Sequence, residues 1–175
     1  MKKQEEKNNF QKRGKMEFKT DVFGIYDKEW ALLAAGTKES YNTMTISWGG
    51  MGTLWSKPVV AVYVKPIRYT HRFMEKNDYF TVSFYPEQYR NALLLLGTKS
   101  GRDGDKVEEA GLVPVFLDKS VTFIGARITL LCKKIYRQDL DTTAMPTEVV
   151  KSFYANEDAH TMYIGEVVEI LEEQE

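Results

Sequence analysis

The stretch YNTMTISWGGMG, residues 41–52, decides the fold predicted for this chain. Alternate side chains of a β-strand point to opposite faces. The two faces would carry Thr43, Thr45 and Ser47 on one side, and Asn42, Met44, Ile46 and Trp48 on the other. The pattern predicts a strand with one core face and one row of hydroxyls, followed by three glycines. An isolated row of this kind is often only a solvated face, so a ligand role needs further support.

The composition predicts one compact domain with a substantial core, because 43% of the 175 residues are hydrophobic. Residues 1–15 are polar and charged, which predicts a flexible tail before a single domain over residues 16–175. A basic docking arm is the alternative for this tail, although two glutamates interrupt its lysines. The formal net charge of -1 gives no overall field that favours nucleic acid or an anionic membrane.

Cysteine usage and hydropathy predict a cytoplasmic protein. Cys132 is the only cysteine, so no disulfide can form within the chain. The start of the chain has no apolar core of a secretory signal, and no apolar run approaches the roughly 18–20 residues that span a membrane. Cys132 as a nucleophile would need an electropositive, accessible setting, and its apolar run favours a buried structural thiol instead.

Strand patterns dominate the rest of the chain and alternate with a few short helical patterns. The strand patterns cover residues 30–36, 42–48, 58–64, 79–85, 121–137 and 160–173, with bends expected at Gly125 and Gly165. Helices are predicted over 69–78, 86–98 and 103–112. Thr70 is the candidate N-cap of the first, Gly97 the stop of the second, and Asp105 lies near the start of the third. These patterns predict a mainly β barrel or sandwich with short decorating helices.

Several kinds of chemistry are excluded by the motifs. His71, His160 and Cys132 lack the spacing of a zinc site. The sequence contains no nucleophile elbow, metalloprotease or Walker motif, and GGMG does not lead into a Rossmann helix.

Three segments combine hydroxyls or cations with exposed backbone, and together they favour a phosphorylated ligand. The first is the strand of residues 42–48, and the second is the turn of Arg68, Tyr69 and Thr70 at a helix start. The third is a glycine-punctuated loop with Thr98, Lys99, Ser100, Arg102 and Lys106. Each segment alone could be an ordinary polar surface. Together they predict a phosphate-bearing aromatic ligand, provided that they converge in space.

The same segments resemble the flavin reductase-like, FMN-binding split-barrel family. The resemblance rests on NTMTISWGGMGTLWSKPVVAVYVKPIRYT, NDYFTVSF, LGTKSGRDGDKVEEAGL and AHTMYIGEV, in family order over residues 30–168. It implies a six-stranded antiparallel split β-barrel, a homodimer and one FMN per subunit near the dimer interface. Pyridoxamine-phosphate oxidases share the general barrel, but their phosphate signatures match this chain less well.

The resemblance also implies the residues that hold the cofactor. The strand would line the flavin ring and ribityl chain, the turn would bind the phosphate, and the loop would close over the flavin. The implied set is Asn42, Thr43, Met44, Thr45, Ser47, Trp48, Lys65, Arg68, Tyr69, Thr70, Thr98, Lys99, Ser100, Arg102 and Lys106, with His160 near the open flavin face.

The implied activity is that of an FMN-dependent oxidoreductase. It would take hydride from NAD(P)H and pass electrons to a flavin or another acceptor, and such chemistry needs no protein acid–base pair. A flavoredoxin-type electron carrier with redox-protein partners and little NAD(P)H activity is the alternative. A non-catalytic flavin-binding module is a third possibility.

Overall fold

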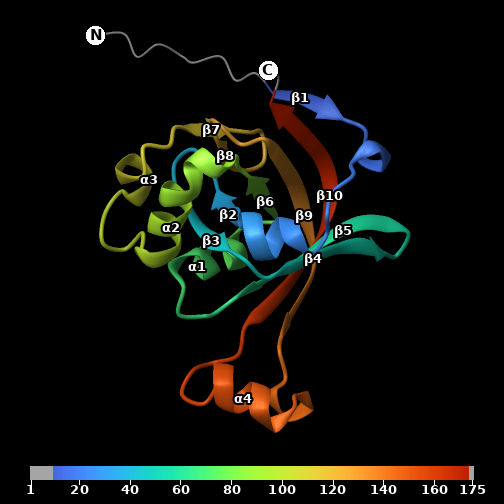
Figure 1. Cartoon of the computed structure of the whole chain (residues 1–175), viewed down its shortest axis with the longest axis vertical. Coiled ribbons are helices and arrows are strands. Elements are labelled where there is room, and N and C mark those ends of the chain that lie inside the picture. Colours follow the sequence, from blue (N-terminus) through green and yellow to red (C-terminus); the bar gives the residue numbers. More distant parts are fainter. Residues whose placement is uncertain (1–9, 174–175) are drawn as a thin grey trace.

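The computed structural model describes residues 10–173 of the 175-residue chain. Its main feature is a curled antiparallel sheet in the order β3-β2-β6-β9-β10-β5-β4, with β1 paired to β10 (Figure 1). The strands of this sheet are β1 (Phe10–Arg13), β2 (Ala31–Gly36), β3 (Tyr41–Ile46), β4 (Gly49–Leu54), β5 (Lys57–Val64), β6 (Tyr79–Phe84), β9 (Ile128–Asp139) and β10 (Thr161–Glu173). A small second sheet pairs β7 (Pro114–Phe116) with β8 (Val121–Phe123).

The sheet is a split barrel because its two terminal strands are neighbours in the sequence. Only Ser47 and Trp48 separate β3 from β4, so the curled sheet brings its two ends together without pairing them. The predicted mainly β split barrel is confirmed, and its six strand patterns correspond to β2, β3, β5, β6, β9 and β10. The fifth pattern breaks at Gly125, whose φ of 86° separates β8 from β9. The sixth has a register shift at Gly165, as expected.

Residues 10–173 form four short α-helices. They are α1 (Tyr69–Lys76), α2 (Arg90–Thr98), α3 (Lys106–Glu109) and α4 (Thr147–Phe153). Single turns of other helix types lie at Lys15–Glu17, Ile25–Glu29, Glu87–Tyr89 and Thr142–Ala144. Asp105 lies at the start of α3 as predicted and is its N-cap, because its carboxylate accepts from the backbone N–H groups of Val107 and Glu108.

Several predictions about local structure are corrected. Thr70 lies inside α1, and Arg68 occupies the N-cap position without a side-chain capping bond. Gly97 does not stop α2, which continues to Thr98. The glycines of 49–52 belong to strand β4 and pair with β5. The predicted tail is ordered from Phe10 onward as β1, and residues 1–9 lie outside the described residues.

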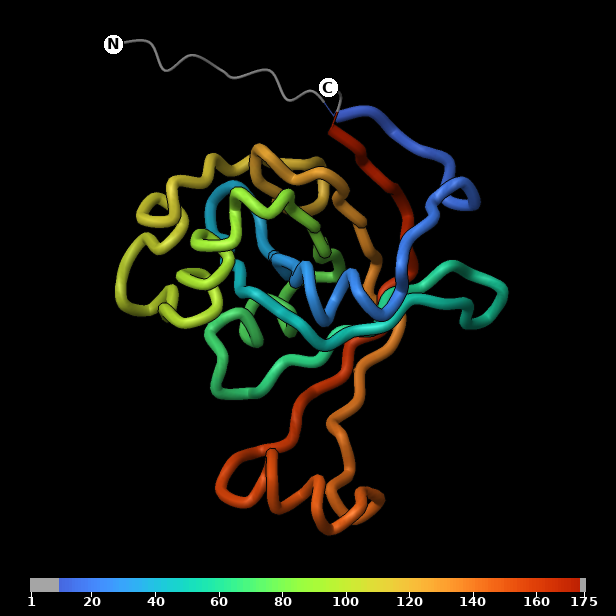
Figure 2. Tube along the Cα trace, in the orientation of Figure 1, coloured from blue at the N-terminus to red at the C-terminus, as the bar shows by residue number. Residues whose placement is uncertain are grey.

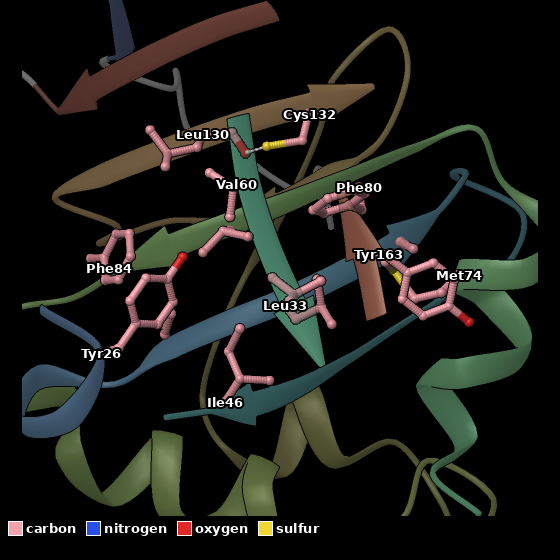
Figure 3. Close-up of a cluster of buried hydrophobic side chains, with 14 of the residues drawn as sticks. Tyr26, Leu33, Ile46, Val60, Met74, Phe80, Phe84, Leu130, Cys132 and Tyr163 are labelled. Atoms are coloured by element: carbon pink, nitrogen blue, oxygen red, sulfur yellow. Dashed lines mark hydrogen bonds between the residues drawn. The ribbon is translucent and has the colours of Figure 1, made fainter. Parts of the chain in front are cut away.

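The core consists of two apolar layers on the two sides of the sheet. The larger fills the barrel interior with side chains from β2, β5, β6, β9 and β10, among them Leu33, Val60, Phe80 and Tyr163 (Figure 3). The smaller lies between the sheet and α2, around Leu32, Leu93 and Phe123. Cys132 is fully buried in the interior, and burial raises the pKa of its thiol, as expected of a structural cysteine.

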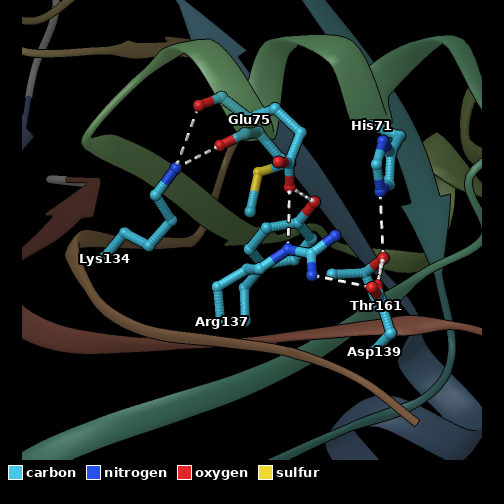
Figure 4. Close-up of polar contacts among 8 residues, drawn as sticks. His71, Glu75, Lys134, Arg137, Asp139 and Thr161 are labelled. Carbon is cyan, nitrogen blue, oxygen red and sulfur yellow. Dashed lines mark hydrogen bonds and ion pairs between the residues drawn. The ribbon is translucent and has the colours of Figure 1, made fainter.

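Helix α1 is anchored at its C-terminal end by a polar network from β9 and β10 (Figure 4). Lys134 Nζ donates to the carbonyls of Met74 and Glu75, at 2.5 and 3.3 Å, where cations are favoured by the helix dipole. Arg137 bridges Glu75 and Asp139, and Thr161 donates to Asp139. The anchored C-terminus fixes where the N-terminus of α1 points.

The chain between β9 and β10 leaves the barrel as an arm, residues 140–160, which carries α4 at its tip (Figures 1 and 2). The sequence patterns give no element there. At the C-terminal end of α4, Phe153 and Tyr154 face the barrel, since the Phe153 ring contacts Trp48 and the Tyr154 ring contacts His160.

Candidate functional site

The three predicted ligand segments converge on one pocket, called here the cationic pocket. It has a volume of 260 Å³ and lies between the N-terminus of α1 and the C-terminus of α2, beside β3. Its lining is Asn42, Met44, Ile67, Arg68, Tyr69, Thr70, Thr98, Lys99, Ser100, Gly101, Arg102 and Lys106. Ten of the sixteen predicted site residues belong to this lining.

Two contacts hold the segments together. Asn42 Nδ2 on β3 donates to Thr70 Oγ1 on α1 at 2.8 Å, so both side chains are buried within the wall. The loop after α2 approaches the same asparagine closely. A Cβ added at Gly101 would lie 2.2 Å from Asn42 Oδ1, so only glycine fits at this contact.

Three cations of the cationic pocket have no carboxylate partner among the described residues. Arg68 Nη2 donates to Gly97 O at 2.6 Å, and Lys106 Nζ donates to Leu96 O and Lys99 O at 2.9 and 3.0 Å. Arg102 donates to Ile67 O and lies over the ring of Tyr69. The carbonyl end of a helix carries partial negative charge, which offsets only part of this charge. The pocket therefore keeps a local excess of positive charge.

Burial lowers the pKa values of two of these cations, Lys106 and Arg68. Lys106 is only 4% exposed, and its burial together with the nearby charge of Arg68 lowers the lysine pKa to about 8. Burial also lowers the pKa of Arg68. An anion placed between them would relieve both costs. Lys99 differs, because it pairs with Glu109 at the exposed rim.

The predicted hydroxyl row of β3 does not point into this pocket. Thr43 Oγ1 donates to Leu33 O and Thr45 Oγ1 to Leu93 O, so both hydroxyls are used by the protein backbone. The pocket is lined instead by Asn42 and Met44, from the face that was assigned to the core. The expected orientation of the hydroxyl face is therefore corrected for these two threonines.

The backbone of β3 offers polar groups where its hydroxyls do not. β3 ends the sheet, and the pair Thr37–Ser40 exchanges two backbone hydrogen bonds at its hairpin. Antiparallel pairing then alternates, so the N–H and C=O groups of Asn42 and Met44 face β2. Those of Thr43 and Thr45 point to the unpaired edge. Thr43 is fully buried and Thr45 is half-buried, so a flat polar ligand can reach this edge at Thr45.

This edge runs alongside the turn that follows β5. At one end Gly49 pairs with Val62, and at the other end Asn42 bonds to Thr70. The edge of β3 therefore leads from the cationic pocket toward Ser47 and Trp48.

A second cavity, called here the aromatic cavity, lies at the Ser47–Trp48 end. It has a volume of 630 Å³, within the roughly 300–1,000 Å³ typical of small-molecule sites. Its lining is Val22, Phe23, Tyr26, Asp27, Ser47, Trp48, Gly49, Tyr63, Leu140, Tyr154, His160 and Met162. Three predicted residues, Ser47, Trp48 and His160, thus lie here and not in the cationic pocket.

His160 has a defined environment in the aromatic cavity. Its Nδ1 is 2.9 Å from the Tyr154 hydroxyl, and its ring lies against Trp48 with centroids 5.3 Å apart. Burial, followed by the charge of Lys65, lowers the histidine pKa, while Glu157 acts in the opposite sense. His160 is therefore mainly neutral at pH 7.

Lys65 does not reach the cationic pocket. It follows β5 directly, but its ammonium pairs with Glu157 of the arm and lies 5.8 Å from the Tyr154 ring centroid. Lys65 does precede the predicted phosphate turn in the sequence, but its side chain points toward the arm and away from the cationic pocket.

Two groups of residues that line the pockets were not predicted from the sequence. Gly101 and Ile67 lie between predicted residues, and Gly101 could have been found from its place in a glycine-rich loop. The residues from the 22–27 turn and from the arm, including Tyr154, carry no motif. Their contribution to the aromatic cavity depends on packing alone.

Two absences hold for residues 10–173. No group of three or more His, Cys, Asp or Glu side chains could hold a metal ion there. No helix in this range combines the length and the apolar character that crossing a membrane requires.

Comparison with known proteins identifies the family of the chain. The family model for the flavin reductase like domain matches residues 23–175. The chain belongs to this family. A comparison with the curated proteins finds no match.

Solved structures show the same fold at low sequence identity. An FMN-binding domain of a flavin reductase-like enzyme from Shewanella baltica has a TM-score of 0.68 at 16% identity, covering 95% of this chain and 78% of its own. Flavoredoxin from Methanosarcina acetivorans has a TM-score of 0.68 at 20% identity, covering 93% and 77%. The NADH:FAD oxidoreductase SgcE6 from Streptomyces globisporus has a TM-score of 0.63 at 17% identity, covering 82% and 74%.

Proposed function

We propose that this flavin reductase-like protein is an FMN-dependent oxidoreductase that takes hydride from NAD(P)H and passes electrons to a flavin or another acceptor. The observation that carries the proposal is the cationic pocket, where Arg68, Arg102 and Lys106 lack a carboxylate partner among the described residues. A phosphate supplies the missing negative charge, and each charged hydrogen bond to it is worth roughly 1.5–3 kcal/mol.

The order of the two pockets along β3 supports a placement for the rest of FMN. With its phosphate between Arg68 and Lys106, the ribityl chain would pass Asn42 and Met44. The isoalloxazine ring would follow the edge of β3, where the backbone groups of Thr45 would bond to its polar rim. Its far end would reach Trp48 and the aromatic cavity.

The flavin supplies the hydride chemistry, and the chain's residues bind and orient it. Arg68 and Lys106 fix the phosphate end. The β3 edge would orient the ring, and the Thr45 backbone N–H would be a donor for the negative charge of reduced flavin. Trp48 and Phe153 limit access of water at the other end.

We also propose a homodimer. Phe23, Trp48 and Phe153 are 84%, 46% and 47% exposed, and Phe23 and Trp48 both line the aromatic cavity. Exposed aromatic side chains grouped in this way are typical of an interface. Light scattering at micromolar concentration should give twice the chain mass of 20.2 kDa, and a monomeric mass would contradict this.

The first test is the visible spectrum of freshly purified protein. Flavin absorption that survives gel filtration, or that returns on reconstitution with FMN, supports the cofactor. A colourless protein that cannot be reconstituted contradicts it. Steady-state oxidation of NADH and NADPH by the holoprotein then tests the enzyme, and turnover with either donor supports a reductase.

A flavoredoxin-type electron carrier is the second candidate. The aromatic cavity has no lysine or arginine in its described lining, so it offers no cation for the phosphates of a dinucleotide. A holoprotein that is reduced by dithionite but turns over with neither nicotinamide would favour this candidate. A flavin that dithionite also fails to reduce would favour a non-catalytic module.

A further inference from the structure

The walls of the aromatic cavity indicate what kind of molecule enters it. Aromatic side chains from four parts of the chain line it, among them Phe23, Trp48, Tyr63 and Tyr154. The charged side chain in the described lining is Asp27, and Glu157 lies nearby on the arm, paired with Lys65. Such a cavity favours an uncharged planar molecule over one that carries phosphates.

Two polar groups of this mainly aromatic lining are hydrogen-bonded to each other. The Tyr154 hydroxyl and His160 Nδ1 are hydrogen-bonded at 2.9 Å, and both residues line the cavity. Both come from the arm and its junction with β10, whereas Trp48 comes from the β3–β4 link. In the tautomer with its proton on Nδ1, His160 donates to the Tyr154 oxygen and leaves the Tyr154 O–H free to donate to a molecule in the cavity.

We infer that the aromatic cavity takes an uncharged para-quinone as electron acceptor, and that Tyr154, hydrogen-bonded to His160, donates the proton that completes its reduction. The inference rests on the proposed function for the source of the electrons. Phosphorylated acceptors, free FMN among them, lack a cation in this cavity.

The reaction balances with the groups named. Bound FMN, once reduced, would supply the hydride: one quinone oxygen would gain it as an O–H bond, the quinone ring would become aromatic and the flavin would be oxidised. The other oxygen is left as a phenolate and takes the proton of the Tyr154 hydroxyl. A neutral His160 passes its Nδ1 proton to the Tyr154 oxygen while its Nε2 takes a proton from solvent. The product is the hydroquinone, and the sum is one hydride plus one proton.

The test uses holoprotein whose FMN has been reduced with one equivalent of dithionite without oxygen. Its reoxidation is followed by stopped flow with 1,4-naphthoquinone and, separately, with ferricyanide, which accepts electrons without protons. Tyr154→Phe should lower the ratio of the quinone rate to the ferricyanide rate at least about tenfold. The matched control is Tyr136→Phe, since Tyr136 lies on β9 with its hydroxyl bonded to Gln138, and it should keep the wild-type ratio. An unchanged ratio in Tyr154→Phe would overturn the proton donor.

Binding is tested without the flavin. Calorimetric titration of the apoprotein with 1,4-naphthoquinone should give a dissociation constant about fivefold higher in Trp48→Leu than in Trp55→Leu. Trp55 is 63% exposed and lies outside the described cavity lining. Equal constants, or no binding to wild-type apoprotein, would overturn the quinone site. Failure to reconstitute with FMN would instead overturn the proposed function, and the titration of the apoprotein would still decide the occupant of the cavity.

Discussion

The two ends of the β3 edge differ in how they can hold a ligand. The cationic pocket is small and gathers Arg68, Arg102 and Lys106 without carboxylates. The aromatic cavity is more than twice as large and has no lysine or arginine in its described lining. One end therefore fixes a ligand by charge, and the other receives flat apolar surface.

The cationic pocket and the aromatic cavity therefore have different roles in ligand binding. In the cationic pocket, charged hydrogen bonds to the phosphate give affinity and fix the position of the ligand along the β3 edge. Weak aromatic contacts at the other end let a second molecule enter and leave. Substitutions at the two ends should therefore change different quantities.

The largest expected effect is at Arg68. Arg68→Ala removes a charged donor of the cationic pocket and should raise the FMN dissociation constant roughly 10- to 100-fold. Fluorescence titration of apoprotein with FMN measures it. Arg13→Ala is the charge-matched control, because Arg13 pairs with Glu172 on the distant β1–β10 edge, and it should bind FMN like wild type. An unchanged constant in Arg68→Ala would place the phosphate elsewhere.

A smaller effect is expected at Gly101. In Gly101→Ala the new Cβ would lie 2.2 Å from Asn42 Oδ1, so the loop that carries Arg102 must move. We expect FMN to bind about tenfold more weakly. Gly52→Ala is the matched control, since nothing lies within 4 Å of a Cβ there. Equal affinities of the two variants would show that the loop position does not matter for binding.

Lys106 should make FMN binding depend on pH. Its pKa in the ligand-free fold is lowered to about 8, so the ammonium that meets the phosphate is lost as pH rises above 8. FMN affinity should be constant near pH 7 and fall about tenfold by pH 9.5. Lys106→Met should bind more weakly at pH 7 and show a flatter profile. Parallel profiles of the two proteins would exclude Lys106 as the titrating group.

The lowered pKa of Lys106 also changes the stability of the ligand-free protein, and this effect has the opposite dependence on pH. The unfolded chain, with an ordinary lysine pKa, binds more protons than the fold between pH 8 and about 10.5. The contribution of this lysine to the free energy of unfolding should therefore rise over that range.

The smallest expected effect is at Trp48. Trp48→Leu should weaken FMN binding about threefold, because one half-exposed aromatic contact is worth roughly 0.5–1.5 kcal/mol. High salt should not change this difference between wild type and variant, whereas it should reduce the effect of Arg68→Ala. A salt-dependent Trp48 effect, measured by the same titration, would contradict the division between the two ends.

The cationic pocket was largely predictable because its residues carry local signals. Arg68 and Thr70 follow a strand and begin a helix, and Ser100 and Lys106 lie in a glycine-rich loop. Their convergence was not predictable from spacing, since it depends on how the barrel brings α1 and α2 to opposite sides of β3.

Other features depended on contacts between distant residues. Alternation separated Thr43 and Thr45 from Met44, but it could not say which face would meet α2. Lys65 is directed by Glu157, 92 residues later in the chain. The arm has no periodic pattern, so Tyr154 could be placed in the aromatic cavity only by the structure.

The central claim is that the cationic pocket binds the phosphate of FMN. It is tested most directly by titrating wild-type and Arg68→Ala apoprotein with FMN and with riboflavin, which has the same ring and ribityl chain but no phosphate. We predict that Arg68→Ala weakens FMN binding roughly 10- to 100-fold and leaves riboflavin binding almost unchanged. Equal losses for the two ligands, or none for either, would contradict the claim.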